Sequence, residues 1–248
     1  MNVVLGCDTK GGKMARLSMT SLGSKYNALV IGASGGIGEA LAAHLEADGT
    51  CNQVTQLSRR NDGFDLRDEN SVLRAACSLQ SVAFDLILCA TGALTIDGAG
   101  PEKSIRHISQ DAMMAQFAVN AVGPALVLKH FTPLLANKKR AIFAVLSARV
   151  GSIGDNKLGG WISYRGSKAA LNQIVHTAAI EVCRTKPEAL IVAVHPGTVA
   201  TTLSDAYAPG RKRFEPSDAA ERILRMLDDL RLGGNGGFFA YDGTTIVW

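Results

Sequence analysis

The feature that most restricts the fold of this chain is a glycine-rich turn between a short apolar run and a helical stretch. Residues 28–31 have strand character, and Gly32-Ala33-Ser34-Gly35-Gly36-Ile37-Gly38 follows them before a helical pattern over 39–45. The glycines at 32, 36 and 38 allow a tight turn and a close approach of the backbone to a phosphate, which the positive end of the next helix attracts. A strand, a turn and a helix in this order favour nucleotide binding.

The rest of the chain alternates apolar runs with helical stretches, as a parallel sheet covered on both faces requires. We expect one domain, residues 25–248, with a doubly wound α/β sheet of the Rossmann type and about seven strands. Strands are expected at 28–31, 54–57, 84–89, 141–146, 190–195 and 237–241, with a weaker one around Phe64 and Asp65. Crossover helices are expected at 111–135, 161–183 and 217–230. Right-handed crossovers then bring the turns after the strands to one edge of the sheet.

The first 24 residues differ from the rest. They are rich in Gly, Ser, Thr and Lys, contain Asp8 as the only acid, and lack the sustained apolar core of a secretion signal. We expect residues 1–24 to be a flexible or loosely packed extension. An organellar targeting sequence, or a translation start at Met14 or Met19, is an alternative reading.

Composition narrows the classes of partner. A chain of 248 residues suits one α/β core, and a formal net charge of +4 gives no reason to expect nucleic acid. No apolar run approaches the roughly eighteen residues of a membrane span, so no membrane partner is expected. The five cysteines are scattered, and neither they nor the five histidines show metal-type spacing. We therefore expect no metal, and a reducing, cytoplasmic location.

A second motif carries the chemistry. Tyr164 and Lys168 are four residues apart in a segment with helical character, so their side chains share one helix face. An ordinary tyrosine has a pKa near ~10. A neighbouring ammonium should lower that pKa and make the phenol a usable proton donor and acceptor.

Together, Gly-x-x-x-Gly-x-Gly and Tyr-x-x-x-Lys resemble the short-chain dehydrogenase/reductase family over nearly the whole chain from about Lys25. Asn120-Ala121-Val122-Gly123 is similar to the family's Asn-x-x-Gly motif, and Ser147 ends a strand where the family has its catalytic serine. His195-Pro196-Gly197-Thr198-Val199 resembles the turn beside the nicotinamide. Residues 147–156, 159–161 and the C-terminal end resemble the C-factor and sniffer-like carbonyl reductase branch. Two departures are a longer loop between Ser147 and Tyr164, and Cys89-Ala90-Thr91-Gly92 in place of Asn-Asn-Ala-Gly.

The choice of cofactor is predicted from the end of the second strand. Enzymes that prefer NAD usually have an acid there to hold the ribose hydroxyls. Leu57-Ser58-Arg59-Arg60 has none, and the guanidinium of Arg59 suits a 2′-phosphate, with Ser34 as a further donor. We therefore expect NADP (NADPH), with a solvated surface pair of arginines as the alternative reading.

The resemblance implies a role for each matched residue. Tyr164 is the proton donor, Ser147 orients the carbonyl oxygen, Lys168 holds the nicotinamide ribose, and Asn120 anchors a water in the proton relay. Asp65 and Leu66 lie beside the adenine. The complete set expected to bind the cofactor is Gly32, Ser34, Gly36, Ile37, Gly38, Arg59, Asp65, Leu66, Ala90, Gly92, Asn120, Tyr164, Lys168, Pro196, Gly197, Val199 and Thr201.

These features predict an NADPH-dependent carbonyl reductase, or alcohol dehydrogenase in reverse, acting on a small-molecule carbonyl substrate. A C-factor-like signalling protein that binds the nucleotide with little turnover is the alternative from another class, and an NAD-linked pteridine or steroid enzyme the alternative within the class. Substrate choice is expected to depend on the loop 148–161 and on 198–214, which has the character of a lid. The resemblance favours a homodimer through the helices near 109–135 and 161–183, and leaves a monomer open.

Overall fold

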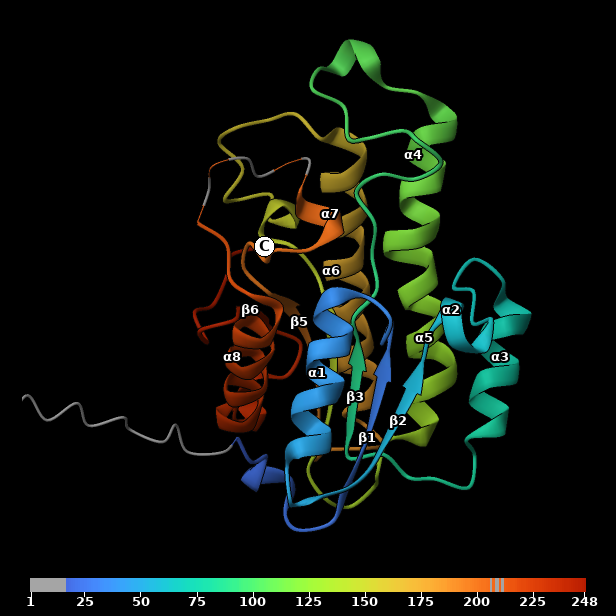
Figure 1. The fold of residues 1–248 in the computed structure, drawn as a ribbon, viewed down its shortest axis with the longest axis vertical. Helices are drawn as coiled ribbons and strands as arrows, with labels where there is room; N and C mark the ends of the chain where they lie inside the picture. Colours follow the sequence, from blue (N-terminus) through green and yellow to red (C-terminus); the bar gives the residue numbers. More distant parts are fainter. Residues whose placement is uncertain (1–16, 206, 208–209, 211) are drawn as a thin grey trace, which may run out of the picture.

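The computed structural model describes residues 17–205, 207, 210 and 212–248. Its centre is a parallel sheet in the order β2-β1-β3-β4-β5-β6 (Figure 1). The six strands are β1 (Tyr26–Ile31), β2 (Cys51–Leu57), β3 (Leu86–Cys89), β4 (Ala141–Leu146), β5 (Ala189–His195) and β6 (Phe238–Ala240). Because β1 has β2 on one side and β3 on the other, the chain reverses its direction of winding there. In open α/β sheets ligands bind at such a switch point, outside the carboxyl ends of the strands.

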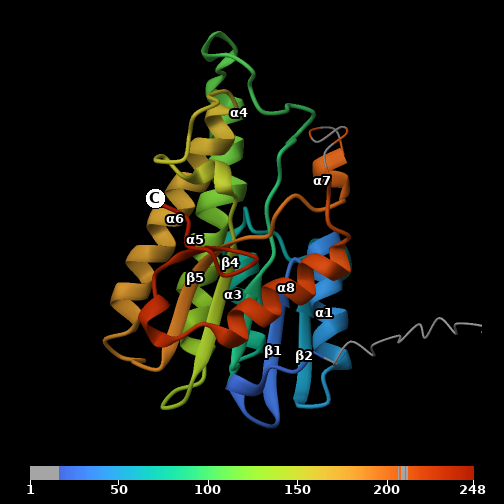
Figure 2. The same ribbon diagram turned by 90° about the vertical axis from the view of Figure 1, so that its left-hand side faces the viewer.

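Helices cover both faces of the sheet (Figure 2). One face carries α1 (Gly36–Ala47) and α8 (Pro216–Asp229), and the other carries α4 (Gln110–Phe117), α5 (Gly123–Phe131) and α6 (Ile162–Val182), with α3 (Glu69–Ser78) packed against α5. The strands β3 to β6 and most of β1 are apolar because successive side chains point to opposite covered faces, whereas the edge strand β2 is largely polar and partly exposed. In β1, Leu29 packs in the cluster that contains Phe131, whereas Val30 packs in the cluster that contains Leu41.

The predicted strand around Phe64 and Asp65 was wrong. This segment links the short helix α2 (Arg59–Asp62) to α3 without joining the sheet. The Phe64 amide donates to the Ser58 carbonyl at 3.3 Å, and the Asp65 amide donates to Ser71 Oγ at 3.1 Å. Local hydrogen bonds therefore satisfy the backbone that a strand would have paired, and the doubly wound sheet has six strands instead of about seven.

The described part of the N-terminal segment packs against the domain. Met19 is fully buried, and its amide donates to Asp48 Oδ2 at 2.9 Å. The Ser21 amide donates to Asp228 Oδ1 at 2.8 Å, which joins the segment to the end of α8. Contacts with the core thus begin before residue 25. Residues 1–16 lie outside the described residues, so their role as an extension stays a prediction.

Within the described residues, one helical stretch is long and apolar enough to cross a membrane, judged by length and composition alone. It covers Gln110–Leu134, and its mean hydropathy is 1.3 in the most apolar window, of which 39% is buried. Here α4 packs on α6, and α5 packs on α3. Core helices of soluble proteins meet the same criteria.

Candidate active site

The glycine turn is shaped by close backbone contacts. Gly32 has φ +90°, and a Cβ there would lie 2.8 Å from the carbonyl oxygen of Ala90. A Cβ on Gly38 would lie 2.2 Å from the carbonyl oxygen of Gly32. Neither position accepts a side chain, so the first turn of α1 packs directly on the end of β1. The free amides at the start of α1 are then available to an anionic group.

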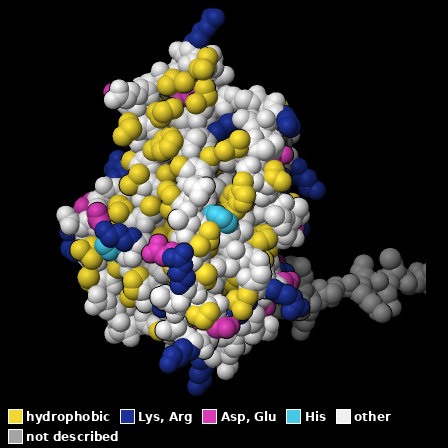
Figure 3. Space-filling view, turned by 180° about the vertical axis from the view of Figure 1, so that it is seen from behind, with side chains coloured by type: hydrophobic (Ala, Val, Ile, Leu, Met, Phe, Trp, Pro, Cys, Tyr) yellow, Lys and Arg dark blue, Asp and Glu magenta, His cyan; other side chains and the backbone are white. Residues whose placement is uncertain are grey.

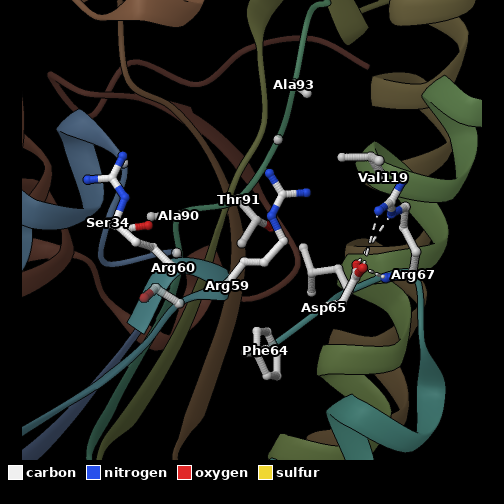
Figure 4. A pocket seen from close by; sticks show the side chains of 15 residues that line it. Ser34, Arg59, Arg60, Phe64, Asp65, Arg67, Ala90, Thr91, Ala93 and Val119 are labelled. Atoms are coloured by element: carbon white, nitrogen blue, oxygen red, sulfur yellow. Dashed lines mark hydrogen bonds and ion pairs between the residues drawn. The ribbon is translucent and has the colours of Figure 1, made fainter. Parts of the chain in front are cut away.

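The glycine turn forms one wall of a cavity of about 420 Å³, which we call the glycine-turn cavity. The end of β2 with α2, the segment 64–67 and the segment after β3 complete it (Figure 4). Its volume lies in the ordinary range for a small-molecule site, ~300–1,000 Å³. The predicted cofactor residues on this lining are Gly32, Ser34, Arg59, Asp65, Leu66, Ala90 and Gly92.

Arginines surround this cavity. The side chains of Arg59 and Arg60 extend into it from α2, and neither forms an ion pair with any residue that the structure describes (Figure 4). Arg67 was not predicted. Its guanidinium donates to both carboxylate oxygens of Asp65, at 3.3 and 3.2 Å, and so keeps the pKa of that carboxyl below its usual value. The spacing of two residues between Asp65 and Arg67 was the available sequence signal. The role of Asp65 beside an adenine stays a prediction.

The predicted catalytic pair, Tyr164 and Lys168, lies on α6. Tyr164 and Lys168 are one turn apart and both buried, with 7% and 2% of their surfaces exposed. Lys168 Nζ donates to the carbonyl oxygen of Leu146 at 3.0 Å, which ties the ammonium to the end of β4. A Cβ on Gly92 would lie 3.2 Å from Lys168 Nζ and 3.1 Å from Asn120 Oδ1. The glycine after β3 therefore leaves room for these two side chains to meet.

Asn120 lies in a π-helical segment, Ala118–Val122, between α4 and α5. Its amide group accepts from the Ala93 amide and donates to the Ala93 carbonyl, both at 2.9 Å, and it also donates to Gln116 Oε1 at 2.8 Å. Gln116, a residue that the sequence did not single out, in turn donates to the Leu94 carbonyl at 2.7 Å. Wide helical turns often occur at functional sites. Here the wide turn fixes the segment after β3, whereas the relay role of Asn120 stays a prediction.

The expected lowering of the Tyr164 pKa was wrong for this structure. Burial raises the pKa of the Tyr164 phenol, and it also lowers the pKa of Lys168 to about 8. Both shifts have the same cause, because removing either group from water disfavours its charged form. The phenol is therefore protonated at neutral pH, and Lys168 can exchange a proton close to neutral pH.

Ser147 and Tyr164 line the same cavity, which we call the tyrosine cavity. It has a volume of about 200 Å³, and Ile37 joins its wall to the glycine turn. The predicted residues Pro196, Gly197, Val199 and Thr201 line it as well, together with Trp161 and part of α7 (Thr202–Asp205). Ser147 Oγ donates to Asn172 Oδ1 at 2.6 Å, a contact that the sequence did not indicate.

The remaining predicted residues lie behind these walls. Gly36 touches Thr201, because a Cβ there would lie 2.9 Å from Thr201 Cγ2, and Gly38 supports Gly32. Of the predicted lid, 198–214, residues 206, 208–209 and 211 lie outside the described residues. The described part includes α7 and places Leu203 and Tyr207 on the tyrosine cavity. The two cavities and the buried pair define the class of a nucleotide-binding α/β protein with a tyrosine–lysine site.

Comparison with known proteins gives the family. Residues 26–212 match the model of the family described as short chain dehydrogenase, and the chain belongs to this family. It is 29% identical over 232 residues to 1-hydroxy-2-glutathionyl-2-methyl-3-butene dehydrogenase of Rhodococcus sp. (strain AD45), covering 89% of this chain and 98% of the relative. It is 34% identical over 139 residues to C-signal of Myxococcus xanthus, covering 55% and 78%.

Solved structures show the same fold. NADPH-bound carbonyl reductase from chicken fatty liver superposes with a TM-score of 0.80 at 23% identity, covering 91% of this chain and 95% of that one. The carbonyl reductase Sniffer of D. melanogaster superposes with a TM-score of 0.77 at 20% identity, covering 90% and 100%. The predicted resemblance to C-factor is thus confirmed by the C-signal relative, and the Sniffer structure shows that the fold is shared.

Proposed function

We propose that this chain is an NADPH-dependent oxidoreductase that interconverts a small carbonyl compound and its alcohol. The observation that carries the proposal is the meeting of Ser147 and Tyr164 in one cavity, which joins the glycine turn through Ile37. The buried Lys168 lies one helical turn beyond Tyr164. The Rhodococcus relative is a dehydrogenase, which supports the same class of chemistry.

The residues present fit a dinucleotide phosphate. Two glycines that accept no side chain leave the backbone open to a pyrophosphate, and Ser34 and Arg59 lie where a 2′-phosphate can be held. NADPH in the chicken structure and NADP in a short-chain dehydrogenase/reductase of Burkholderia multivorans support this choice of cofactor. Pro196, Gly197 and Val199 then contact the nicotinamide end. When bound, the reduced nicotinamide supplies the hydride.

The chain's own residues supply the proton and the orientation. Tyr164 is protonated at neutral pH, and it donates its proton to the carbonyl oxygen as negative charge develops there. Ser147 donates a hydrogen bond to the same oxygen and fixes its direction. Lys168, with a pKa of about 8, returns a proton to Tyr164 and holds the ribose. Asn120 orders the water through which that proton arrives.

A second candidate function is a signalling protein that binds the nucleotide with little turnover, and the C-signal relative favours it. Steady-state assays with NADPH and NADH against aldehydes, quinones and diketones separate the two candidates. We expect turnover with NADPH, and a loss of roughly 10²- to 10⁴-fold in kcat for Tyr164→Phe with cofactor binding retained. Cofactor binding without turnover of any substrate would instead favour the signalling protein.

We also propose that the protein is a cytoplasmic homodimer. The four described cysteines are free thiols, which suits a reducing compartment. Seen from the side of α4, α5 and α6, hydrophobic side chains are spread over much of the surface (Figure 3). Met114 on α4 and Ile180 on α6 are 64% and 49% exposed, respectively. Light scattering after size exclusion tests the dimer, and Met114→Lys should weaken it.

A further inference from the structure

A second cavity of about 390 Å³ lies beside the tyrosine cavity, and we call it the Lys212 cavity. Arg149, His195, Gly197 and Thr198 line both cavities, so the two share a wall. The aromatic rings of Phe214 and Tyr241 form another wall. The guanidinium of Arg222 lies 5.0 and 5.9 Å from these ring centroids and fixes them through cation–π contacts.

The Lys212 cavity has an excess of positive charge. Three cations, Arg149, Lys212 and Arg213, line it with a single carboxylate, Asp242. Arg213 Nη1 lies 2.5 Å from Asp205 Oδ1. Arg149 Nη1 lies 3.5 Å from Asp155 Oδ2, which is a longer and weaker ion pair. Lys212 forms no ion pair with any residue in the described part of the chain. Lys212 is therefore available to a ligand, and Arg149, which pairs with Asp155 through Nη1, keeps the other donors of its guanidinium for one.

The shared wall contains an unsatisfied polar atom. His195 Nδ1 is buried and has no hydrogen-bond partner among the described residues. Burial, and then the charge of Arg149, lower the pKa of His195 to about 4, so the ring is neutral at pH 7. A neutral imidazole donates one hydrogen bond and accepts another without adding charge. A buried group of this kind gains from a ligand that pairs with it.

We propose that the Lys212 cavity is a subsite for a carboxylate on the substrate, whose carbonyl group is reduced in the tyrosine cavity. The inference rests on the proposed function and narrows its substrate to oxo acids. The guanidinium of Arg149 offers a planar fork that matches a carboxylate, and Lys212 adds a point charge. The aldehyde or ketone carbon gains a hydride and its oxygen gains a proton, giving a hydroxy acid while the reduced nicotinamide is oxidised.

The test compares substrates that differ in one charge. The probes are 4-formylbenzoate and its methyl ester, succinic semialdehyde and its methyl ester, and 4-formylphenyl phosphate. We expect a higher kcat/KM for each acid than for its ester, and this ratio should fall as ionic strength rises. Lys212→Met should lower the ratio roughly three- to tenfold. Lys138→Met, an exposed change at the opposite end of β4, should leave it unchanged.

Two results overturn the subsite. One is equal kcat/KM for acids and esters with clear turnover of both, which leaves the proposed function standing. The other is a preference for the phosphate over both carboxylates, which changes the class of ligand. If no aldehyde is turned over, calorimetry with 4-(hydroxymethyl)benzoate decides: binding that weakens in Lys212→Met supports the subsite, and absence of binding overturns it.

A second inference concerns Asn172, which lies on α6 two turns after Tyr164. Asn172 and Ser147 are both buried, and the Ser147 hydroxyl donates to Asn172 Oδ1 at 2.6 Å. Asn172 Nδ2 is buried without a hydrogen-bond partner among the described residues. The hydroxyl hydrogen that Ser147 would donate to a substrate oxygen is therefore hydrogen-bonded to Asn172 Oδ1. The two N–H donors on Asn172 Nδ2 have no acceptor among the described residues.

We infer that Asn172 is a positioning residue that controls the Ser147 proton, an inference that also rests on the proposed function. A half-turn of the amide presents Nδ2 to Ser147 Oγ and frees the serine hydroxyl for the carbonyl oxygen. An amide serves both states because it carries a donor and an acceptor on one group. A carboxylate in its place would only accept.

The pH profile tests this role. The kcat of Asn172→Asp, relative to that of the parent protein, should be low at neutral pH. It should rise as the pH falls through the pKa of the new carboxyl, because the protonated carboxyl can donate again. Asn172→Leu should lower kcat about fivefold when Ser147 is present and have no further effect on Ser147→Ala. If Asn172→Asp does not fold, the Asn172→Leu pair decides. Equal losses in both backgrounds would show a structural role only, and no loss in Ser147→Ala itself would remove the serine from the proposed function.

Discussion

The nucleotide end and the carbonyl end of the site are built in different ways. Around the glycine-turn cavity, most residues directly follow β1, β2 or β3, and backbone contacts such as that of Gly38 with Gly32 fix their positions. Around the tyrosine cavity, Ile37, Ser147, Tyr164 and His195 come from regular elements or their ends, whereas most of the other wall residues belong to loops, a 3-10 turn and the short α7. Backbone sterics therefore shape much of the nucleotide end, whereas side-chain contacts shape much of the carbonyl end.

Side-chain contacts are the weaker kind of constraint. Trp161 packs edge-on against Tyr164 and Tyr207, with ring centroids 6.3 and 5.6 Å apart. Such contacts contribute on the order of 1 kcal/mol each, whereas an overpacked backbone position costs up to about 3 kcal/mol. Changes at the nucleotide end should thus have large effects on folding and cofactor affinity, and changes at the loops should have small effects on KM.

The largest effect is expected for Gly38→Ala. The new Cβ would lie 2.2 Å from the Gly32 carbonyl oxygen, so the turn must shift. We expect a loss of about 3 kcal/mol in the free energy of unfolding, and roughly 100-fold weaker NADPH binding. Denaturant unfolding and fluorescence titration measure the two. Gly49→Ala is the matched control, because nothing lies within 4 Å of its Cβ position; equal effects of the two changes would contradict the steric account.

Lys168→Met should make the folded protein more stable and at the same time remove its activity. The folded pKa of Lys168, about 8, lies below its ordinary value of 10.5, so the unfolded chain binds the proton more tightly. The free-energy cost of burying the charged Lys168 therefore destabilises the cofactor-free protein. This cost is present in full below pH 8 and disappears as the pH rises to 10.5. We expect Lys168→Met to raise the free energy of unfolding by roughly 2–3 kcal/mol at pH 7 and by under ~1 kcal/mol at pH 10, while kcat collapses.

Denaturant unfolding at the two pH values measures this difference. Lys138→Met supplies the baseline, because it is the same substitution at an exposed lysine. A gain for Lys168→Met that is equal at pH 7 and pH 10 would mean that the ammonium is not held in a water-poor site.

Most of the nucleotide end could be predicted from the sequence because its chemistry depends on residues next to one another in the chain. The turn 32–38 and the pair Arg59 and Asp65 all line or support the cavity as expected. The strand around Phe64 was the error, since the Ser71 side chain that satisfies its backbone lies on another element. Gln116 and Asn172 were missed for the same reason: each acts through a partner distant in sequence.

The sign of the Tyr164 pKa shift could not be predicted from spacing. The distance between Tyr164 and Lys168 along a helix indicates proximity, but it carries no information on how much water the fold removes. Both residues are almost fully buried, and the loss of water sets the direction of both pKa shifts. Burial is a property of the packed helices and sheet, so it enters only with the tertiary structure.

Arg59→Gln tests cofactor choice at the nucleotide end. Losing a charged donor to a 2′-phosphate should weaken NADPH binding roughly 10- to 30-fold, or about 1.5–2 kcal/mol, and leave NADH binding nearly unchanged. Fluorescence titration with each cofactor gives both constants. Arg60→Gln is the companion change, and a smaller effect there would assign the phosphate to Arg59. If the ratio of NADPH to NADH affinity is unaltered in both variants, the NAD-linked enzyme becomes the favoured alternative.

The smallest effect is expected at the carbonyl end, for Tyr207→Phe. The Tyr207 hydroxyl and Thr95 Oγ1 form a hydrogen bond of 2.5 Å, which ties the segment after α7 to the segment after β3. This bond is exposed to solvent, so its loss should raise KM for a small aldehyde about two- to fivefold and change kcat little. Thr95→Val should have the same effect, and the double variant should add nothing further. Additive losses in KM would show that the two side chains act separately and that loop contacts do not set the shape of this cavity.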